Sequence, residues 1–250
     1  MAKRYELNEA QWQRVRDLLP GKASDPGRTA TDNRLFVNGV LWVLRSGARW
    51  SDLPERYGKY KSVHKRFTRW ARAGVWERVF AVLSRDRDNE YLMIDSSIVR
   101  AHAQAATGKR GLRDQALGRS RGGLTSKIHL AVDSLGRPVR FLLTGGQAND
   151  AANALPLLVG LSARHVVADR AYDAHAILDI IEAAGATPVI PQRTCMKRAR
   201  AFDPDLYKHR NRIERTIGKL KQLRRIATRY DRLPTNYLAS LYLASLSFWS

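Results

Sequence analysis

The stretch YLMIDSSIV, residues 91–99, is where the sequence changes to strand-like patterning. It is mostly apolar and has the length of a strand, with one carboxylate, Asp95, set within it. Apolar runs of this length are typical of strands. We therefore place the first strand of a sheet at residues 91–99, with Asp95 inside it.

The residues after this strand predict two more strands and then an alternation of helices and strands. Residues 127–133 and 138–144 form a hairpin around the turn at 134–137. The later elements, in chain order, are a helix through 155–158, a strand at 164–169, a helix at 173–184, a strand at 187–190, a long helix at 207–228 and a final helix after Pro234. Three leading strands followed by this alternation are similar to the arrangement of the ribonuclease H fold. The expected fold class is therefore α/β with a ribonuclease-H-like core.

The first 85 or so residues predict short helices. Asn8, with Gln11 three residues later, resembles the capping box that begins a helix. A second helix ends at Gly47, a plausible C-cap, and a third begins with Ser62 as N-cap and ends at Gly74. The basic residues of the third helix are Lys61, Lys65, Arg66, Arg69 and Arg72. Such helices suggest a helix-turn-helix-like DNA reader, and the alternative is a solvated basic helix face.

The change of patterning predicts two domains. Residues 1–88 would form an N-terminal all-α domain, helix-turn-helix-like and DNA-binding. Residues 89–250 would form the ribonuclease-H-like domain. The charged stretch RDRDN at 85–89 is the expected hinge between them.

The charge of the chain is far from balanced. It has 44 Lys and Arg against 23 Asp and Glu, which gives a net charge of +21 and a pI near 10.8. Such a field favours polyanions, and nucleic acid is the first candidate because phosphate contacts dominate that kind of affinity. A basic membrane-surface protein, or charge that serves solubility alone, is the alternative.

The sequence predicts a protein without a membrane span or a disulfide framework. A single cysteine, Cys195, excludes an internal disulfide and fits a reducing cytosol. Charged residues follow Met1 at once, so no secretory signal is expected. The apolar stretch at 237–249 is broken by serines and falls short of the roughly 20 apolar residues that a spanning helix needs. We expect a cytoplasmic protein; the family resemblance described below further implies a bacterial, nucleoid-associated one.

Three carboxylates stand out against this basic background. Asp95 lies in the first strand, Asp169 ends the fourth, and Glu214 lies in the long helix. In a ribonuclease-H-like arrangement the first and fourth strands are neighbours and the helix crosses them, so the three carboxylates converge. Such a cluster repels itself unless divalent cations neutralise it, and Mg²⁺ prefers carboxylates, waters and phosphate oxygens. For a single strand-borne Asp the alternative is an incidental edge or turn residue.

The long helix carries a second pattern, Tyr207-x2-Arg210-x3-Glu214-x6-Lys221. On an uninterrupted helix these four side chains fall within roughly 60° of one another. One face would then present a metal ligand flanked by phosphate binders. The alternative is a solvated amphipathic helix with scattered charge.

This pattern is the signature of the bacterial insertion-sequence DDE transposases of the families numbered four and five, and the chain resembles them over most of its length. The segments that carry the resemblance are 47–54, 62–67, 94–102, 118–129, 168–173, 212–214 and 219–230. Only 44 residues separate Asp169 from Glu214. That is too short for the large β-rich insertion of family-four members, so the chain is more similar to family five.

The resemblance implies a function, a metal triad and partners. Asp95, Asp169 and Glu214 would be the catalytic residues and would hold two Mg²⁺ or Mn²⁺ ions. The protein would bind the terminal inverted repeats of an insertion sequence, hydrolyse a strand at the transposon end and transfer the freed 3′-hydroxyl to target DNA. Double-stranded DNA would be its partner, with a homodimer or larger assembly on it. The alternatives are a ribonuclease-H-like nuclease or resolvase, and a catalytically silent DNA-binding regulator.

The DNA contacts are expected from the third N-terminal helix, the stretch 107–127 and the long C-terminal helix. The basic, glycine-rich stretch 107–127 would close on DNA phosphates and be disordered without DNA, and the alternative is a solvated surface loop. The expected contact residues are Tyr207, Arg210, Lys221, Lys65, Arg66, Arg69, Arg119, Arg121 and Lys127.

The remaining polar residues are expected to be structural. We interpret Asp133 as a turn residue and Asp150 and Asp173 as helix N-caps. Five histidines show no metal-ligand spacing and are expected to be structural or on the surface: His102, His129, His165, His175 and His209.

Overall fold

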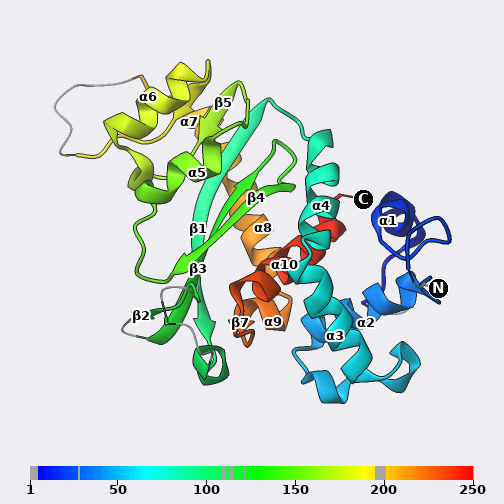
Figure 1. The fold of residues 1–250 in the computed structure, drawn as a ribbon. Coiled ribbons are helices and arrows are strands. Elements are labelled where there is room, and N and C mark those ends of the chain that lie inside the picture. The colour runs from blue at the N-terminus through cyan, green and yellow to red at the C-terminus, as the bar shows by residue number, and fades with distance from the viewer. Residues whose placement is uncertain are drawn as a thin grey trace. The chain divides into compact units, whose positions relative to one another are not determined.

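The computed structural model describes residues 5–27, 29–107, 111–112, 115–120, 122–194 and 201–249 (Figure 1). The chain divides into two compact units. The helical unit comprises Met1–Arg85, His102–Gly108 and Leu220–Ser250, and the sheet unit comprises Asp86–Ala101 and Lys109–Lys219. The change of unit after residue 85 lies close to the expected boundary, but residues 220–250, expected in the second domain, belong to the helical unit.

The sheet unit is built on a mixed sheet with the strand order β2-β3-β1-β5-β6, and β4 pairs with β3. Its strands are β1 Tyr91–Ala101, β2 Gly118–Ser120, β3 Gly123–Val132, β4 Pro138–Gly145, β5 His165–Val167 and β6 Thr187–Val189. The pairs β1–β3 and β3–β4 are antiparallel, whereas β1–β5 and β5–β6 are parallel. The expected strands and the α/β fold class are confirmed, and β2 is an additional strand.

Helices lie against both faces of this sheet. They are α5 Ala154–Leu158, α6 His175–Ala183, α7 Pro204–Tyr207 and α8 Asn211–Lys221. Helix α5 packs against β3 and β4, and α8 crosses behind the sheet in Figure 1. The single long helix expected at 207–228 is wrong, because a 3₁₀ turn at Lys208–Arg210 separates α7 from α8.

The helical unit contains α1 Glu9–Val15, α2 Asn33–Ser46, α3 Tyr60–Arg72, α4 Val75–Leu83, α9 Arg224–Ala227, the short β7 Thr228–Arg229 and α10 Pro234–Ser245. An aromatic cluster forms its core, in which the Trp70 ring lies 5.1 Å from Phe36 and 5.3 Å from Trp76 between centroids. Helix α10 packs on α2, α3 and α4. The tyrosine hydroxyl of Tyr237 donates to the Ile226 carbonyl at 2.6 Å, which joins α10 to α9.

The helix ends test the caps that the sequence predicts. The capping box of Asn8 and Gln11 is present, and Gly47 ends α2 in the left-handed conformation with φ 76°. Ser62 as N-cap is wrong, because Gly58, with φ 91°, turns the chain earlier and α3 begins at Tyr60. Asp173 as N-cap is also wrong, because α6 begins at His175 and the Asp173 carboxylate accepts the Arg193 backbone N–H at 2.6 Å.

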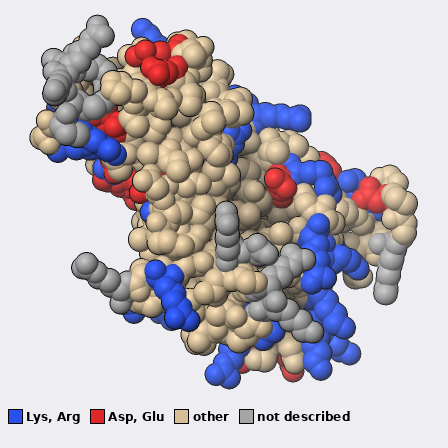
Figure 2. Space-filling view, turned by 60° about the vertical axis from the view of Figure 1, so that its left-hand side comes forward, with Lys and Arg blue, Asp and Glu red and all other residues tan. Residues whose placement is uncertain are grey.

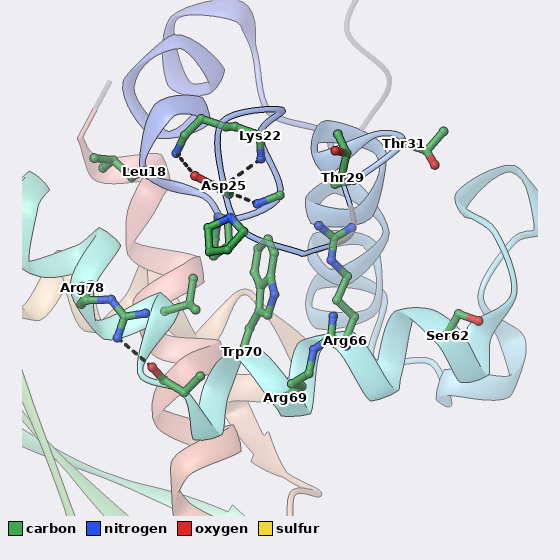
Figure 3. Close-up of a pocket in the computed structure, with 16 residues that line it drawn as sticks. Leu18, Lys22, Asp25, Thr29, Thr31, Ser62, Arg66, Arg69, Trp70 and Arg78 are labelled. Atoms are coloured by element: carbon green, nitrogen blue, oxygen red, sulfur yellow. Dashed lines mark hydrogen bonds and ion pairs between the residues drawn. The ribbon is translucent and has the colours of Figure 1, made fainter.

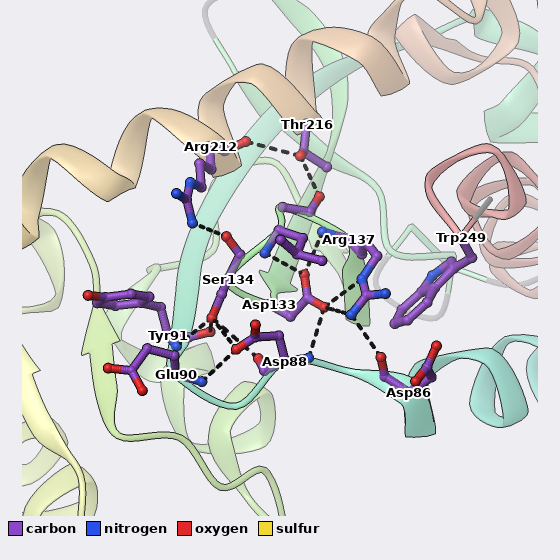
Figure 4. Close-up of polar contacts among 12 residues, drawn as sticks. Asp86, Asp88, Glu90, Tyr91, Asp133, Ser134, Arg137, Arg212, Thr216 and Trp249 are labelled. Carbon is purple, nitrogen blue, oxygen red and sulfur yellow. Dashed lines mark hydrogen bonds and ion pairs between the residues drawn. The ribbon is translucent and has the colours of Figure 1, made fainter.

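The turn between β3 and β4 binds helix α8 through hydrogen bonds (Figure 4). The fully buried carboxylate of Asp133 accepts the Arg137 backbone N–H at 2.8 Å and its Nε at 2.7 Å. The Thr216 hydroxyl of α8 donates to the Gly136 carbonyl at 2.6 Å, and the Arg212 guanidinium donates to the Ser134 carbonyl. Asp133 is therefore the expected turn residue, and its turn fixes the helix that carries Glu214.

Replacing Asp133 by asparagine is expected to lower the free energy of unfolding by about 2 kcal/mol, because a charge-assisted pair inside the protein is lost while the side-chain shape is kept. Chemical denaturation measures this change. Asp179→Asn, on the exposed face of α6, is the matched control and should leave stability unchanged. Equal stability of the two variants would contradict the role of Asp133.

Candidate active site

Asp95 and Asp169 are brought together by the register of β1 and β5. The two strands run parallel, with Met93 opposite Val167 as their last paired residues. Asp95 lies two residues beyond Met93 within β1, and Asp169 lies two residues beyond Val167, just after the end of β5. The two carboxylates are close enough for the charge of Asp169 to raise the pKa of the Asp95 carboxyl. Asp169 also begins a 3₁₀ turn, in which its carboxylate accepts the Ala171 N–H at 2.8 Å.

Arg210 joins Asp95 to the third carboxylate. Its guanidinium donates from Nη2 to Asp95 Oδ2 at 3.1 Å and from Nη1 to Glu214 Oε1 at 2.5 Å. The Asp95 side chain is 13% exposed and that of Glu214 is 51% exposed. The expected pairing of Arg210 with Glu214 on one helix face is present although α8 begins only after Arg210.

The three carboxylates influence one another electrostatically. Burial raises the pKa of the Asp95 carboxyl, the Ser96 amide and Arg210 act against this, and the charges of Asp169 and Glu214 raise it further. Burial opposes the charge of Arg210, yet Asp95 and the neighbouring acids hold the pKa of its guanidinium above the ordinary value. The site therefore concentrates negative charge that requires a cation beside it.

The residues suit a hard divalent cation by their chemistry. Asp95, Asp169 and Glu214 supply only oxygen donors, which Mg²⁺ and Mn²⁺ prefer, and their mutual repulsion favours cation binding. Within the described part of the chain, however, no three metal-ligating side chains are grouped as a ready-made site. The guanidinium of Arg210 lies between two of the carboxylates instead. The donor set fits such an ion once Arg210 moves aside.

A second polar cluster lies on the other face of the same strands. Ser96, which points away from Asp95, donates its hydroxyl to Asp150 Oδ1 at 2.7 Å. The Lys127 ammonium donates to the same oxygen at 2.9 Å and to the Ala148 carbonyl at 2.6 Å. Asp150 stands at the expected N-cap position, before the 3₁₀ turn Ala151–Asn153, but its side chain makes no cap hydrogen bond, and the side chain of Asn149 accepts the Ala152 N–H at 3.4 Å instead. Nor does the structure support Lys127 as a DNA contact, because its side chain is only 10% exposed and already bonded within the protein.

Two buried rings adjoin this cluster. Burial lowers the pKa of His129 to about 4, and its Nε2 lies 2.8 Å from the Thr144 hydroxyl. Burial, followed by the carboxylates of Asp150, Asp95 and Asp169, raises the pKa of the Tyr172 hydroxyl, which approaches Ser96. His129 is therefore structural, as expected, and Tyr172 is a residue that the sequence analysis missed.

The neutral His129 ring predicts a loss of stability in acid. The unfolded chain takes up a proton near pH 6.5, whereas the folded protein does so only near pH 4. The contribution of the neutral ring is therefore complete above pH 6.5 and is lost as the pH falls toward 4. Between pH 7 and pH 5 the loss should reach about 2 kcal/mol. Urea unfolding of the wild type and of His129→Leu checks this, and parallel pH profiles would contradict it.

The structure separates the expected DNA contacts into exposed and packed residues. Lys65 and Arg69 on α3 and Arg119 on β2 are exposed. Arg66 is half-buried, with its guanidinium 4.3 Å from the Phe36 ring and 4.5 Å from Trp70, so its placement does not support a DNA contact.

The other expected contacts lie near α8 or outside the described residues. Tyr207 is partly exposed and packs against Phe202, with ring centroids 5.4 Å apart. Lys221 ends α8, and burial lowers the pKa of its ammonium. Arg121 lies outside the described residues, as do parts of the stretch 107–127 that was expected to be disordered.

The helical unit also has a basic groove that the sequence analysis did not single out (Figure 3). It has a volume of about 1020 Å³, and its charged lining residues are Lys22, Asp25, Arg66, Arg69 and Arg78. Asp25 is engaged locally, because it accepts the backbone N–H groups of Gly21 at 2.7 Å and Lys22 at 3.0 Å. The groove therefore presents positive charge beside α3.

The surface agrees with the charge of the sequence. On the face shown in Figure 2, Lys and Arg side chains cover more of the surface than Asp and Glu, and they gather toward the lower right of the view. No helix among the described residues is long and apolar enough to cross a membrane. The described surface therefore suits a polyanionic partner.

Comparison with known proteins identifies two families along the chain. Residues 7–80 match the putative transposases of the IS4/5 family, and residues 86–249 match the transposase DDE domain. Among solved structures, the piggyBac transposase synaptic complex with hairpin DNA is similar with a TM-score of 0.42 and 15% identity. That similarity covers 79% of this chain, which spans about half the length (49%) of the piggyBac chain.

Several bacterial proteins are similar in sequence. An uncharacterized protein, y4sN, of Sinorhizobium fredii is 49% identical over 104 residues, which cover 42% of this chain and 83% of the relative. A putative transposase for insertion sequence element IS6501 of Brucella ovis is 38% identical over 128 residues, covering 50% of this chain and 98% of the relative. A putative transposase for insertion sequence element IS402 of Burkholderia cepacia is 32% identical, covering 43% of this chain and 54% of the relative. These matches show that the chain belongs to the DDE transposases of insertion sequences.

Proposed function

We propose that this chain binds the terminal inverted repeats of an insertion sequence, cuts DNA at these ends and joins them to a target. One observation carries the proposal. Arg210 links Asp95 to Glu214, and Asp169 follows the strand that pairs in parallel with the strand of Asp95, in a chain of the DDE transposase family. This arrangement supports a site that uses three carboxylates from distant parts of the sequence.

The proposed cofactors are two Mg²⁺ or Mn²⁺ ions held by Asp95, Asp169 and Glu214. Bound there, divalent ions would supply the charge that activates an attacking oxygen and stabilises the leaving oxygen during in-line displacement at phosphorus. Each carboxylate has a separate structural support. Strand β1 holds Asp95, the turn after β5 holds Asp169, and the docked helix α8 holds Glu214.

We propose two roles for Arg210, one in the free protein and one when DNA is bound. In the free protein its guanidinium neutralises Asp95 and Glu214. When DNA arrives, the same planar donors suit a phosphate group, which arginine binds bidentately. Tyr207 and Lys221, at either end of the signature, would bind and orient the DNA backbone on the same side.

The reaction would proceed as hydrolysis followed by transesterification. In the first step water attacks a phosphodiester at the transposon end and frees a 3′-hydroxyl. In the second step that hydroxyl attacks a phosphodiester of the target, and a target 3′-oxygen leaves. Neither step requires a covalent bond to the protein, so the site needs no serine or tyrosine nucleophile.

For the helical unit we propose contacts with the DNA backbone through α3. Lys65 and Arg69 are exposed on this helix, and Arg69 also lines the basic groove. Each phosphate contact that is lost should reduce the salt slope of log K by about 0.9. Lys65→Ala/Arg69→Ala should therefore bind all sequences more weakly, with a slope smaller by about two.

Fluorescence anisotropy at several salt concentrations measures these slopes. Arg16→Ala, which removes an exposed cation at the end of α1, is the control and should leave the slope unchanged. An unchanged slope in the double variant would exclude α3 as a contact surface. Pairing of two ends implies a homodimer or larger assembly, and a protein of this kind would be associated with the bacterial nucleoid.

The test of the function is cleavage of DNA that carries the flanking inverted-repeat end, with Mg²⁺ or Mn²⁺ present. End-specific nicks followed by joined products are expected. Nicks without joining would show a ribonuclease-H-like nuclease or resolvase instead. Binding without cutting, with either metal and with paired ends supplied, would show a DNA-binding regulator.

A further inference from the structure

A partly buried ion pair lies on the face of the sheet opposite to Asp95, on the side to which Ser96 points. The Lys127 ammonium of β3 and the Asp150 carboxylate, which follows β4, meet at 2.9 Å. Their side chains are 10% and 26% exposed. Removing two charges from water is costly, and such a pair often contributes no more stability than apolar side chains of the same size. Stability alone therefore does not explain why this ion pair is present.

One contact of this pair reaches the residue next to Asp95 on β1. One oxygen of Asp150 accepts both the Lys127 ammonium and the Ser96 hydroxyl at 2.7 Å. Ser96 follows Asp95 directly, so a bond to Ser96 fixes the backbone from which the Asp95 side chain projects. Alternating side chains place Asp95 on one face of β1 and Ser96 on the other.

The same network reaches the other aspartate. Tyr172, three residues after Asp169, is almost completely buried and places its hydroxyl near Ser96. The turn that carries it is also held from outside, because the Arg193 guanidinium donates to the Ala171 carbonyl at 2.6 Å. Lys127, Asp150 and Ser96 are thus joined by hydrogen bonds, and the buried ring of Tyr172 lies beside them; we call these four residues the supporting network.

We propose that Lys127 and Asp150 are positioning residues, which fix the separation and direction of Asp95 and Asp169 through Ser96 and Tyr172 without touching DNA. This inference rests on the proposed function, because it assigns a role within the same site. Mutation of residues that hydrogen-bond to metal-binding side chains typically lowers activity or metal affinity by about ten- to hundredfold. Lys127→Met should therefore lower the cleavage rate by about that factor.

The rate must be separated from binding and from folding. Single-turnover cleavage of a preformed complex with end DNA, well below the unfolding temperature, should slow in Lys127→Met and in Asp150→Asn. The dissociation constant for the same DNA should remain that of the wild type. Arg164→Met is the matched control, because it breaks an exposed ion pair with Glu90 at the opposite end of the β1–β5 pair. This control should cut at the wild-type rate.

Two further changes keep the test decisive if a single variant folds poorly. Lys127→Met/Asp150→Asn removes both charges together, and it should fold stably yet remain slow. Ser96→Ala removes only one hydroxyl and should also slow cleavage, whereas Ser96→Thr keeps a hydroxyl and should recover much of the rate. A pair needed only for stability would give a stable double variant with the wild-type rate, which would overturn the proposal.

Amide hydrogen exchange of the full-length protein gives a readout that does not depend on activity. Exchange should quicken in Lys127→Met at residues 95–97 and 169–172, and it should be unchanged in Arg164→Met. If the wild type fails to cut DNA, the proposed function falls, but the exchange pattern still decides the positioning role. Unchanged exchange at both segments would overturn that role even if the wild type is an active transposase.

Discussion

Asp169→Ala should abolish end cleavage while leaving the affinity for end DNA intact. The expected loss in the single-turnover rate is at least about a thousandfold, which corresponds to about 4 kcal/mol of transition-state stabilisation. The reason is the place of Asp169 beside Asp95 at the end of β5. Without its carboxylate the site has one oxygen donor fewer at the point where charge builds up on the phosphate.

The measurement compares cleavage of labelled end DNA by the wild type and the variant at matched occupancy. Asp179→Asn again serves as the control, since Asp179 is exposed on α6. Full activity of Asp169→Ala would remove Asp169 from the proposed triad. Loss of DNA binding together with cleavage would show that the substitution acts through folding.

Arg210→Met is expected to have the second largest effect, because it removes the cation that now lies between Asp95 and Glu214. The largely buried Asp95 carboxylate would then keep the Ser96 backbone N–H at 2.8 Å but would lose its counter-charge. Breaking a buried pair in this way costs about 3 kcal/mol. The metal-free variant should therefore unfold at a lower denaturant concentration than the wild type.

Added divalent metal should raise the stability of Arg210→Met more than that of the wild type. Because no guanidinium competes for the carboxylates, Mg²⁺ or Mn²⁺ should stabilise Arg210→Met more than it stabilises the wild type. Thermal unfolding at increasing metal concentration measures this difference. An equal metal-induced shift in both proteins would show that Arg210 and the ion do not share a place, although cleavage should still fall through the loss of a phosphate-binding group.

Two of the proposed catalytic carboxylates stand out in the sequence because each leaves a local mark. A charged residue inside an apolar strand, such as Asp95, is unusual in any sequence, and Asp169 repeats the pattern. Their register could not be predicted, since the pairing of β1 with β5 depends on packing between segments more than 60 residues apart. The same limit applies to the ion pair of Arg210 with Asp95, which lie 115 residues apart.

Lys127 shows why charge alone was misleading. The sequence places it at the end of a basic, glycine-rich stretch, where a solvent-facing cation is the ordinary expectation. In the structure it faces the inside of the sheet, with His129 on the same face of β3. Only the alternation of side chains along a strand of known register distinguishes these two placements. Nor does the sequence show that the side chain of Asp150, which follows β4, accepts hydrogen bonds from Ser96 and Lys127.

The single helix expected at 207–228 is interrupted near its start by a 3₁₀ turn and again between Lys221 and Arg224. Helical periodicity continues across residues 208–210, yet the chain tightens there into a 3₁₀ turn. Arg210 still reaches Glu214, because residues 211–214 are α-helical and four residues span about one α-helical turn. Arg210 and Glu214 therefore share a helix face as predicted, although the predicted extent of the helix is wrong.

The path of the chain through its two units bears on how the protein is made. The helical unit takes its first 85 residues from the start of the sequence and α10 from the end. During synthesis α2, α3 and α4 therefore leave the ribosome well before the helix that packs on all three of them. The sheet unit is complete by residue 219, so it can form while those helices still lack a partner. The helical unit is consequently the part of the protein whose synthesis begins first and whose packing is completed last.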